Sequence, residues 1–177
     1  MMASVEAIDR AVQSAQSHAT NLYGLEYAWY KPWMLALGLF LPTLTATHRQ
    51  GSSSITLCPQ YWLFPPHPPP HYKGHCHPDF MHFYTTRSAQ GGVDRKIPIT
   101  TVEVKPLPRT QGRTLDHSFE QAEEQGMSQV SLAYRYPQAH WQGPQVIYQI
   151  SCVGPFWSWI RHTEDPIQSR TSTTDDT

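Results

Sequence analysis

The sequence predicts a single α/β or α+β domain in which helices pack on a β-sheet. Three observations lead to this prediction. Apolar residues recur at helical spacing near the N-terminus, three strand-like segments follow, and a second helical pattern precedes a last apolar segment. The expected order is therefore an N-terminal helical region, a helix, three strands, a helix and a strand.

The N-terminal region, residues 1–42, has the spacing of amphipathic helices. Apolar side chains recur every three or four positions at Ala7, Ile8, Ala11, Val12 and Ala15. Gly24 and Pro32 are expected to divide the region into separate helices, and Pro42 to end it, because proline removes a backbone donor.

Three segments rich in β-branched and aromatic residues come next, at 52–64, 79–87 and 96–105. Residues 65–78 form a Pro- and His-rich loop insertion that cannot pair in a sheet. The pair Gly91–Gly92 predicts a hairpin turn between the second and third strands.

A second helix is predicted over residues 116–136. Its packing stripe consists of Phe119, Ala122, Gly126, Val130 and Ala133. A last strand, or a pair of strands bent at Gly154, is expected over 145–160. The polar tail, 163–177, is expected to be disordered, which leaves one domain over residues 1–162.

The composition limits the classes of function. The formal net charge of -1 gives no global basicity of the kind that marks many nucleic-acid-binding proteins. The run "WMLALGLFLP" is shorter than the ~20 residues of a membrane span, so we expect no membrane partner. Three distant cysteines and a start without a signal-peptide pattern indicate an intracellular protein, in the nucleus or the cytoplasm.

Charged residues gather at one end of the predicted hairpin. Glu103 and Lys105 are two positions apart in a strand, so their side chains share one face, opposite that of Val104. A turn centred on either glycine places Asp79 opposite Glu103 or Lys105, and a centre between them places it opposite Val104 unless a bulge intervenes. If Asp79 were not considered, an ion pair at the protein surface would be enough to explain Glu103 and Lys105.

Two neighbouring carboxylates repel each other, and a divalent cation removes that repulsion. Oxygen ligands suit Mg²⁺ or Mn²⁺, which can acidify a water and stabilise charge on a phosphate. A lysine beside them can orient the attacking water. Asp79, Glu103 and Lys105 therefore have the groups needed for metal-assisted hydrolysis of phosphodiester bonds.

Pro78–Asp79 in "HPDF" and Glu103–Lys105 in "TTVEVKP" resemble the two motif elements of the PD-(D/E)xK nuclease superfamily. The resemblance implies a restriction-endonuclease-like core of helix, three strands, helix and strand. It also implies that Asp79 and Glu103 bind Mg²⁺ or Mn²⁺, and that Lys105 is the catalytic lysine. The expected activity is a nuclease, with DNA as the substrate.

The same resemblance implies further site residues. RecB-like members place a glutamine on the following helix, which makes Gln125 and Gln129 candidates, with Gln121 behind them. Some members add a glutamate from the first helix as a metal ligand, and Glu26 is the candidate here, with Glu6 as the outside choice.

Three residues are candidates for contact with nucleic acid: His77, next to the motif aspartate, and Arg109 and Arg113, from a locally basic stretch. The rings of "GPFWSWI" could stack on bases, but aromatic residues at this density are more often in a core, which is the interpretation we favour. Protein partners are not predicted.

Two alternatives remain open. The first is a catalytically inactive module that keeps the nuclease-like fold and binds protein or nucleic acid. The second is a small zinc-binding protein, because imidazole and thiolate are preferred zinc ligands. Its ligands would come from the cluster His67, His71, His75, His77 and His82, beside Cys76.

Overall fold

The structure is a computed structural model of the 177-residue chain. It describes residues 4–47, 53–61, 63, 77–87, 93–109, 114–135 and 146–167. In chain order the elements are α1 (Val5–Gln16), α2 (Tyr27–Thr47), β1 (Ser53–Pro59), β2 (Phe80–Arg87), β3 (Val93–Lys105), α3 (Leu115–Arg135), β4 (Ile147–Val153) and β5 (Phe156–His162).

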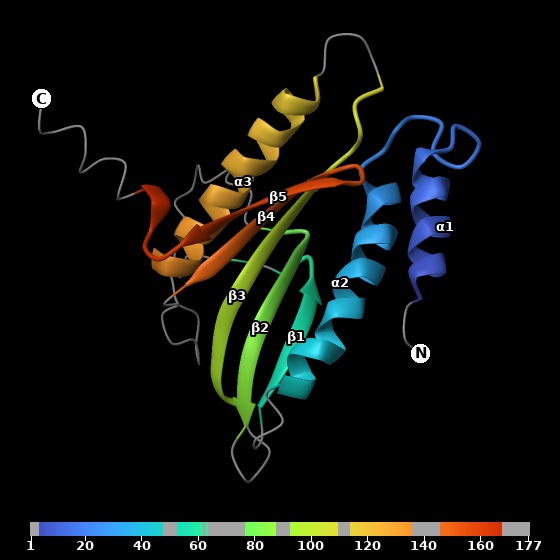
Figure 1. Cartoon of the computed structure of the whole chain (residues 1–177). Helices are drawn as coiled ribbons and strands as arrows, with labels where there is room; N and C mark the ends of the chain where they lie inside the picture. Colours follow the sequence, from blue (N-terminus) through green and yellow to red (C-terminus); the bar gives the residue numbers. More distant parts are fainter. Residues whose placement is uncertain are drawn as a thin grey trace, which may run out of the picture.

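The strands form one mixed sheet in the order β1-β2-β3-β4-β5. All neighbours are antiparallel except β3 and β4, which are parallel and are connected through α3. Helix α3 packs on one face of the sheet, and α1 and α2 lie on the other (Figure 1). The predicted class and the order helix, three strands, helix and strand are confirmed. The last segment forms two strands that turn at Gly154, whose φ is 56°.

The helical region differs from the prediction in where its second helix ends. Gly24, with a φ of 62°, does separate α1 from α2, but α2 continues through Pro32 and Pro42 to Thr47. Pro32 removes one hydrogen bond from a long helix, but it is buried, so packing offsets that loss. No helix in the described part of the chain is long and apolar enough to cross a membrane.

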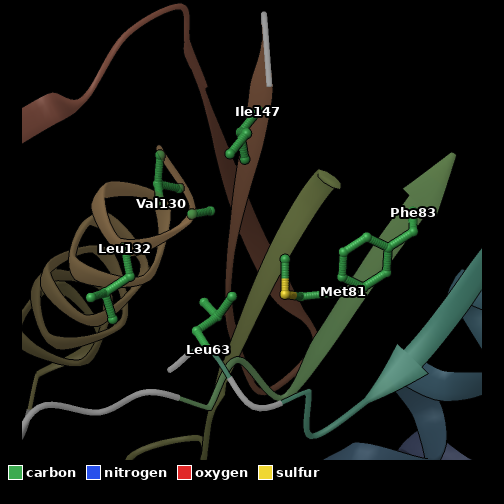
Figure 2. Packing of buried hydrophobic residues seen from close by; sticks show 7 residues of the cluster. Leu63, Met81, Phe83, Val130, Leu132 and Ile147 are labelled. Carbon is green, nitrogen blue, oxygen red and sulfur yellow. The ribbon is translucent and has the colours of Figure 1, made fainter. Parts of the chain in front are cut away.

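Two apolar clusters hold the layers together. On the α3 face, Met81 and Phe83 of β2 pack with Val130 of α3 and Ile147 of β4 (Figure 2). On the opposite face, Phe80, Val102, Val104 and Cys152 pack against α1 and α2 around Trp29, which is 1 % exposed. This alternation along β2 and β3 is the period-2 pattern of a sheet covered on both sides.

The closest approach between α3 and β4 occurs at Gly126. A Cβ at this position would lie 2.5 Å from Nε2 of the fully buried Gln149. That amide donates to the Glu123 carbonyl, and its oxygen lies 2.9 Å from Nε2 of His162. The absence of a side chain at Gly126 therefore allows a polar side chain of β4 to reach the backbone of α3.

We expect Gly126→Ala to lower the free energy of unfolding by about 1–3 kcal/mol, the usual cost of overpacking, because Gln149 must give up bonds to make room. Gly38→Ala is the matched control. Position 38 lies in α2 with nothing within 4 Å of an added Cβ, so alanine there should stabilise by about 1 kcal/mol. Urea unfolding of both variants measures the difference, and equal effects would contradict the close approach.

The described part of the chain extends to Ile167, beyond the predicted domain end at residue 162. Asp165 is buried and forms an ion pair with Arg135 at the end of α3, and the Ile167 amide donates to Asp165. This ion pair attaches residues 163–167 to α3, whereas disorder of the polar tail stays a prediction. Residues 168–177 lie outside the described part.

The interpretation of "GPFWSWI" as core is wrong for its aromatic residues. Phe156, Trp157 and Trp159 of β5 are 50 %, 60 % and 56 % exposed. They belong to an edge strand, and the sequence pattern cannot reveal which part of a sheet the helices leave uncovered.

Candidate active site

The pairing of β2 with β3 sets the position of Asp79. Two register shifts interrupt this pairing, and beyond them Phe80 pairs with Val102. Continuing that register by one step places Asp79 opposite Glu103, rather than opposite Lys105. Bulges of this kind are a common way to re-aim side chains next to a site. The turn glycines lie outside the described residues.

The Asp79 carboxylate is fixed by two donors from different layers. Its Oδ2 accepts a hydrogen bond from the Val104 backbone amide at 2.7 Å, just beyond the paired part of β2. Its Oδ1 accepts one from the Tyr30 hydroxyl of α2 at 2.5 Å. The side chain is 7 % exposed. Asp79 is thus held at the junction of β2, β3 and α2.

Glu103 is equally constrained, from the α3 side. Its Oε1 accepts from Lys105 Nζ at 2.7 Å, and its Oε2 accepts from Gln129 Nε2 at 2.8 Å. Gln129 is fully buried, and its Oε1 has no hydrogen-bond partner among the residues described. The predicted glutamine of α3 therefore contacts the site, and it leaves one acceptor unused.

Glu26 completes the cluster from the residue before α2. Its Oε2 lies 3.3 Å from Lys105 Nζ, and its Oε1 lies 3.0 Å from the Tyr30 hydroxyl. Tyr30 has a single proton to donate, so it serves either Glu26 or Asp79 at any moment. Lys105 and Tyr30 thus link the carboxylates of Glu26, Asp79 and Glu103 into one network.

Burial and the neighbouring charges shift the pKa values of the groups in this network. Burial, with the nearby Glu103 charge, raises the pKa of Asp79 to about 7. Burial also raises the pKa of Glu103, although Lys105 and Gln129 oppose this. Burial acts to lower the pKa of Lys105. The carboxylates of Glu103, Glu26 and Asp79 act more strongly in the other direction, so the pKa of Lys105 is raised. The site therefore contains an excess of buried acid around one protonated lysine.

The donor set fits Mg²⁺ better than a metal that needs a full protein cage. No group of three or more His, Cys, Asp and Glu side chains suited to hold a metal is present among the residues described. Asp79 and Glu103 offer two carboxylates, while Glu26 is turned to Lys105 and Tyr30. Mg²⁺ is commonly held by one or two carboxylates together with waters and substrate phosphate. The unpaired oxygen of Gln129 could accept from such a water.

An open cavity of about 520 Å³ borders the network beside Lys105 and Glu26. Polar residues of α3 line its far wall, among them Gln121, Gln125 and Ser128. Gln125 does not contact the carboxylates in any hydrogen bond described, and its buried Oε1 is unpaired. Of the two predicted catalytic glutamines, only Gln129 is bonded to the site. Gln125 faces the space through which a substrate could approach.

His77 lies near the motif aspartate, Asp79. It lines a second hollow, of about 340 Å³, together with Tyr30, Gln60 and Asp79. Its contact with nucleic acid stays a prediction.

The predicted role of Arg109 in nucleic-acid binding is not supported by its surroundings. Its guanidinium donates to three backbone carbonyls, those of Ala15, Gln16 and Asn21 at the end of α1 and in the following turn. The group closes the turn between the helices and follows the expected preference of a cation for a helix C-terminus. Arg113 lies outside the described residues.

We expect Arg109→Met to lower the free energy of unfolding by about 2 kcal/mol, because buried carbonyls lose a charged donor. Affinity for DNA should not change. Arg10→Met, at an exposed position of α1, is the control and should leave stability within about 0.5 kcal/mol of wild type. Urea unfolding and an oligonucleotide-binding titration check both parts. Unchanged stability with weakened DNA binding would restore the original prediction.

Tyr30 is the residue that sequence reasoning missed. The only signal available was its spacing from Glu26, four residues apart at a helix start, which places both side chains on one face.

The zinc alternative is largely untested, because His67, His71 and His75 lie outside the described residues. His82, the described member of the proposed zinc set besides His77, is buried against Thr100 of β3, and burial lowers its pKa to about 4.

Comparisons of the chain with protein-family models, with curated proteins and with solved structures found no match.

Proposed function

We propose that the protein is a Mg²⁺-dependent nuclease that hydrolyses phosphodiester bonds of DNA, with a site of the PD-(D/E)xK kind. One observation carries the proposal: Asp79, just before β2, converges with Glu103 and Lys105 of β3 at one sheet end, and Tyr30 and Glu26 link the three side chains. The mixed sheet, with its antiparallel β1-β2-β3 and a parallel β4 after α3, supports the finer assignment to a restriction-endonuclease-like fold.

Each residue has a defined task in this proposal. Asp79 and Glu103 would hold the cation, and Tyr30, the Val104 amide and Gln129 keep their carboxylates oriented. When bound, Mg²⁺ supplies positive charge for the phosphate and lowers the pKa of a coordinated water. Because its pKa is raised, Lys105 is protonated at neutral pH and acts as a donor that orients the water or the phosphate.

The direct test is cleavage of end-labelled single-stranded and duplex DNA by the full chain in Mg²⁺, in Mn²⁺ and in EDTA. Cleavage should require the cation and should be lost in Glu103→Gln, which removes a charge at nearly constant shape. Glu120→Gln is the control, since Glu120 is exposed on α3 outside the site and should cleave like wild type. Cleavage that survives in Glu103→Gln would refute the assignment.

Millimolar Mn²⁺ should raise the Tm of the wild type at pH 8 by about 5 °C, because a ligand that binds only the folded state stabilises it. The shift should be smaller at pH 6, because the Asp79 carboxyl, with its pKa raised to about 7, is then mostly protonated and competes with the metal. Scanning fluorimetry of wild type, Asp79→Asn and Glu120→Gln measures this. Equal shifts in wild type and Asp79→Asn would contradict a cation at Asp79.

A further inference from the structure

An exposed row of aromatic rings lies on β4 and β5. The antiparallel register pairs Cys152 with Trp157 and Ile150 with Trp159, so both tryptophans share the face of these β4 residues. Tyr148 of β4 belongs to the same face, and its ring centroid lies 5.9 Å from that of Trp159. We call Tyr148, Trp157 and Trp159 the aromatic strip.

The aromatic strip is not covered by the helices of its face. Helix α2 packs on β1 and β3, whereas β5 forms the opposite edge of the sheet (Figure 1). Trp157 and Trp159 are 60 % and 56 % exposed, and Tyr148 is 36 % exposed. Large rings grouped on an open face mark a site of interaction more often than chance exposure does.

The geometry of the strip suits unpaired bases. Residues two apart in a strand are separated by about 7 Å along the backbone, so the backbone positions of the two tryptophans are spaced at about twice the 3.4 Å step of a DNA strand. One base of an extended strand can therefore stack on each ring, and any base can do so because each has a π-face. Bases inside a duplex are already stacked on their neighbours and cannot reach a flat sheet face.

The charge and the position of the strip also favour a nucleic acid. The side chains that the register places on this face of β4 and β5 include one cation, Arg161, which pairs with Tyr148, and no carboxylate. The strip also starts at the end of the sheet where the candidate active site lies, although on the face opposite the Lys105 side chain. The Gly154 amide, in the turn before β5, donates to the Lys105 carbonyl at 2.9 Å.

We propose that the aromatic strip binds unpaired bases of single-stranded DNA, and that this strand passes around the end of the sheet at the β4–β5 turn toward Lys105 on the other face. The path of the strand toward Lys105 rests on the proposed nuclease function, whereas binding of the bases to the strip does not. Single-stranded DNA, or a single-stranded segment of a larger DNA, is then the substrate.

Fluorescence anisotropy of labelled dT20 in EDTA, where no cleavage is expected, tests the binding by itself. Trp159→Ala should weaken the affinity about tenfold, and the double variant Trp157→Ala/Trp159→Ala further. Trp159→Phe keeps a ring and should retain most of the affinity. Tyr23→Ala is the matched control, because Tyr23 is 80 % exposed but lies in the turn between α1 and α2. All substituted side chains are largely exposed, so the variants should fold, as circular dichroism will verify.

The comparison ligands separate the alternatives. A dT20·dA20 duplex should bind at least about tenfold more weakly than dT20. Equal affinity of wild type and the double variant would overturn the proposal, and tighter binding of rU20 than of dT20 would overturn the choice of DNA. The proposal would also be overturned if the wild type is a dimer in analytical ultracentrifugation and the double variant is a monomer. A second copy of the chain would then cover the strip. Loss of cleavage in Glu103→Gln is measured separately, so either proposal can fail without the other.

Discussion

Replacing Asp79 with asparagine is expected to abolish cleavage and, at pH 8, to stabilise the protein. Loss of a carboxylate that holds the cation should lower kcat/KM by about a thousandfold or more. The same change removes a buried negative charge beside Glu103. The asparagine amide can still satisfy both neighbours, because its oxygen can accept from the Val104 amide while its NH₂ donates to the Tyr30 oxygen.

The stability gain has a definite pH dependence. The pKa of Asp79 is raised to about 7 in the folded protein, above the ~3.9 of an unfolded chain. Between these values the folded state holds a proton that the unfolded state has lost, so wild-type stability falls as the pH rises from about 4 to about 7. Asparagine does not titrate and escapes this loss. We therefore expect Asp79→Asn to gain about 2–4 kcal/mol at pH 8 and little at pH 4.

Urea unfolding at pH 4, 6 and 8, in EDTA, measures this dependence. Asp116→Asn is the control, because Asp116 is an exposed acid at the start of α3. This variant should not be more stable than wild type at pH 8. An Asp79→Asn variant less stable than wild type at pH 8 would show that the carboxylate is not under electrostatic stress.

Replacing Lys105 with methionine is expected to abolish cleavage as well, but to destabilise the protein. The ammonium is the partner of Glu103 at 2.7 Å and of Glu26 at 3.3 Å. Without it, buried acid is left uncompensated, at a cost of about 3 kcal/mol near pH 8. Loss of a group that positions the water or phosphate should lower kcat by about 10²–10⁴-fold.

The pH dependence again has a predictable sign. The pKa of Lys105 is raised in the folded state, so its contribution to stability is fully present below the pKa of an unfolded lysine and is lost only at high pH. The pKa of Glu103 is also raised, so acidification protonates it and should reduce the harm of Lys105→Met. Lys105→Arg keeps the charge and should restore part of the stability without restoring activity. If Lys105→Met were stabilising like Asp79→Asn, the proposed charge balance would be wrong.

The secondary structure and the main cluster could be predicted because they depend on local signals. Strand periodicity placed Glu103 and Lys105 on one face, and a hairpin brought Asp79 to the same end. Helical spacing placed Gln129 near them, although spacing alone could not decide between it and Gln125. The sequence left a bulge as one possibility but could not place the two register shifts, because bulges depend on how neighbouring strands pack.

The rest depends on tertiary packing, which leaves little trace in one sequence. Tyr30 reaches Asp79 only because α2 docks on the sheet in one orientation. Arg109 was assigned to nucleic acid from its charge, but the carbonyls that it binds come from residues more than 80 positions away. Trp157 and Trp159 were assigned to the core because aromatic residues are dense in their segment, although an edge strand leaves them exposed.

The hydrogen bond from the Val104 amide to Asp79 makes the NMR signal of that amide a probe of the site. An amide proton that points at a carboxylate changes its NMR chemical shift when that carboxylate is protonated or binds a cation. The Val104 resonance would therefore trace the titration of Asp79 and its response to Mg²⁺ without a label and without substrate. In this way the main chain of β3 reports the charge state of the residue beside it.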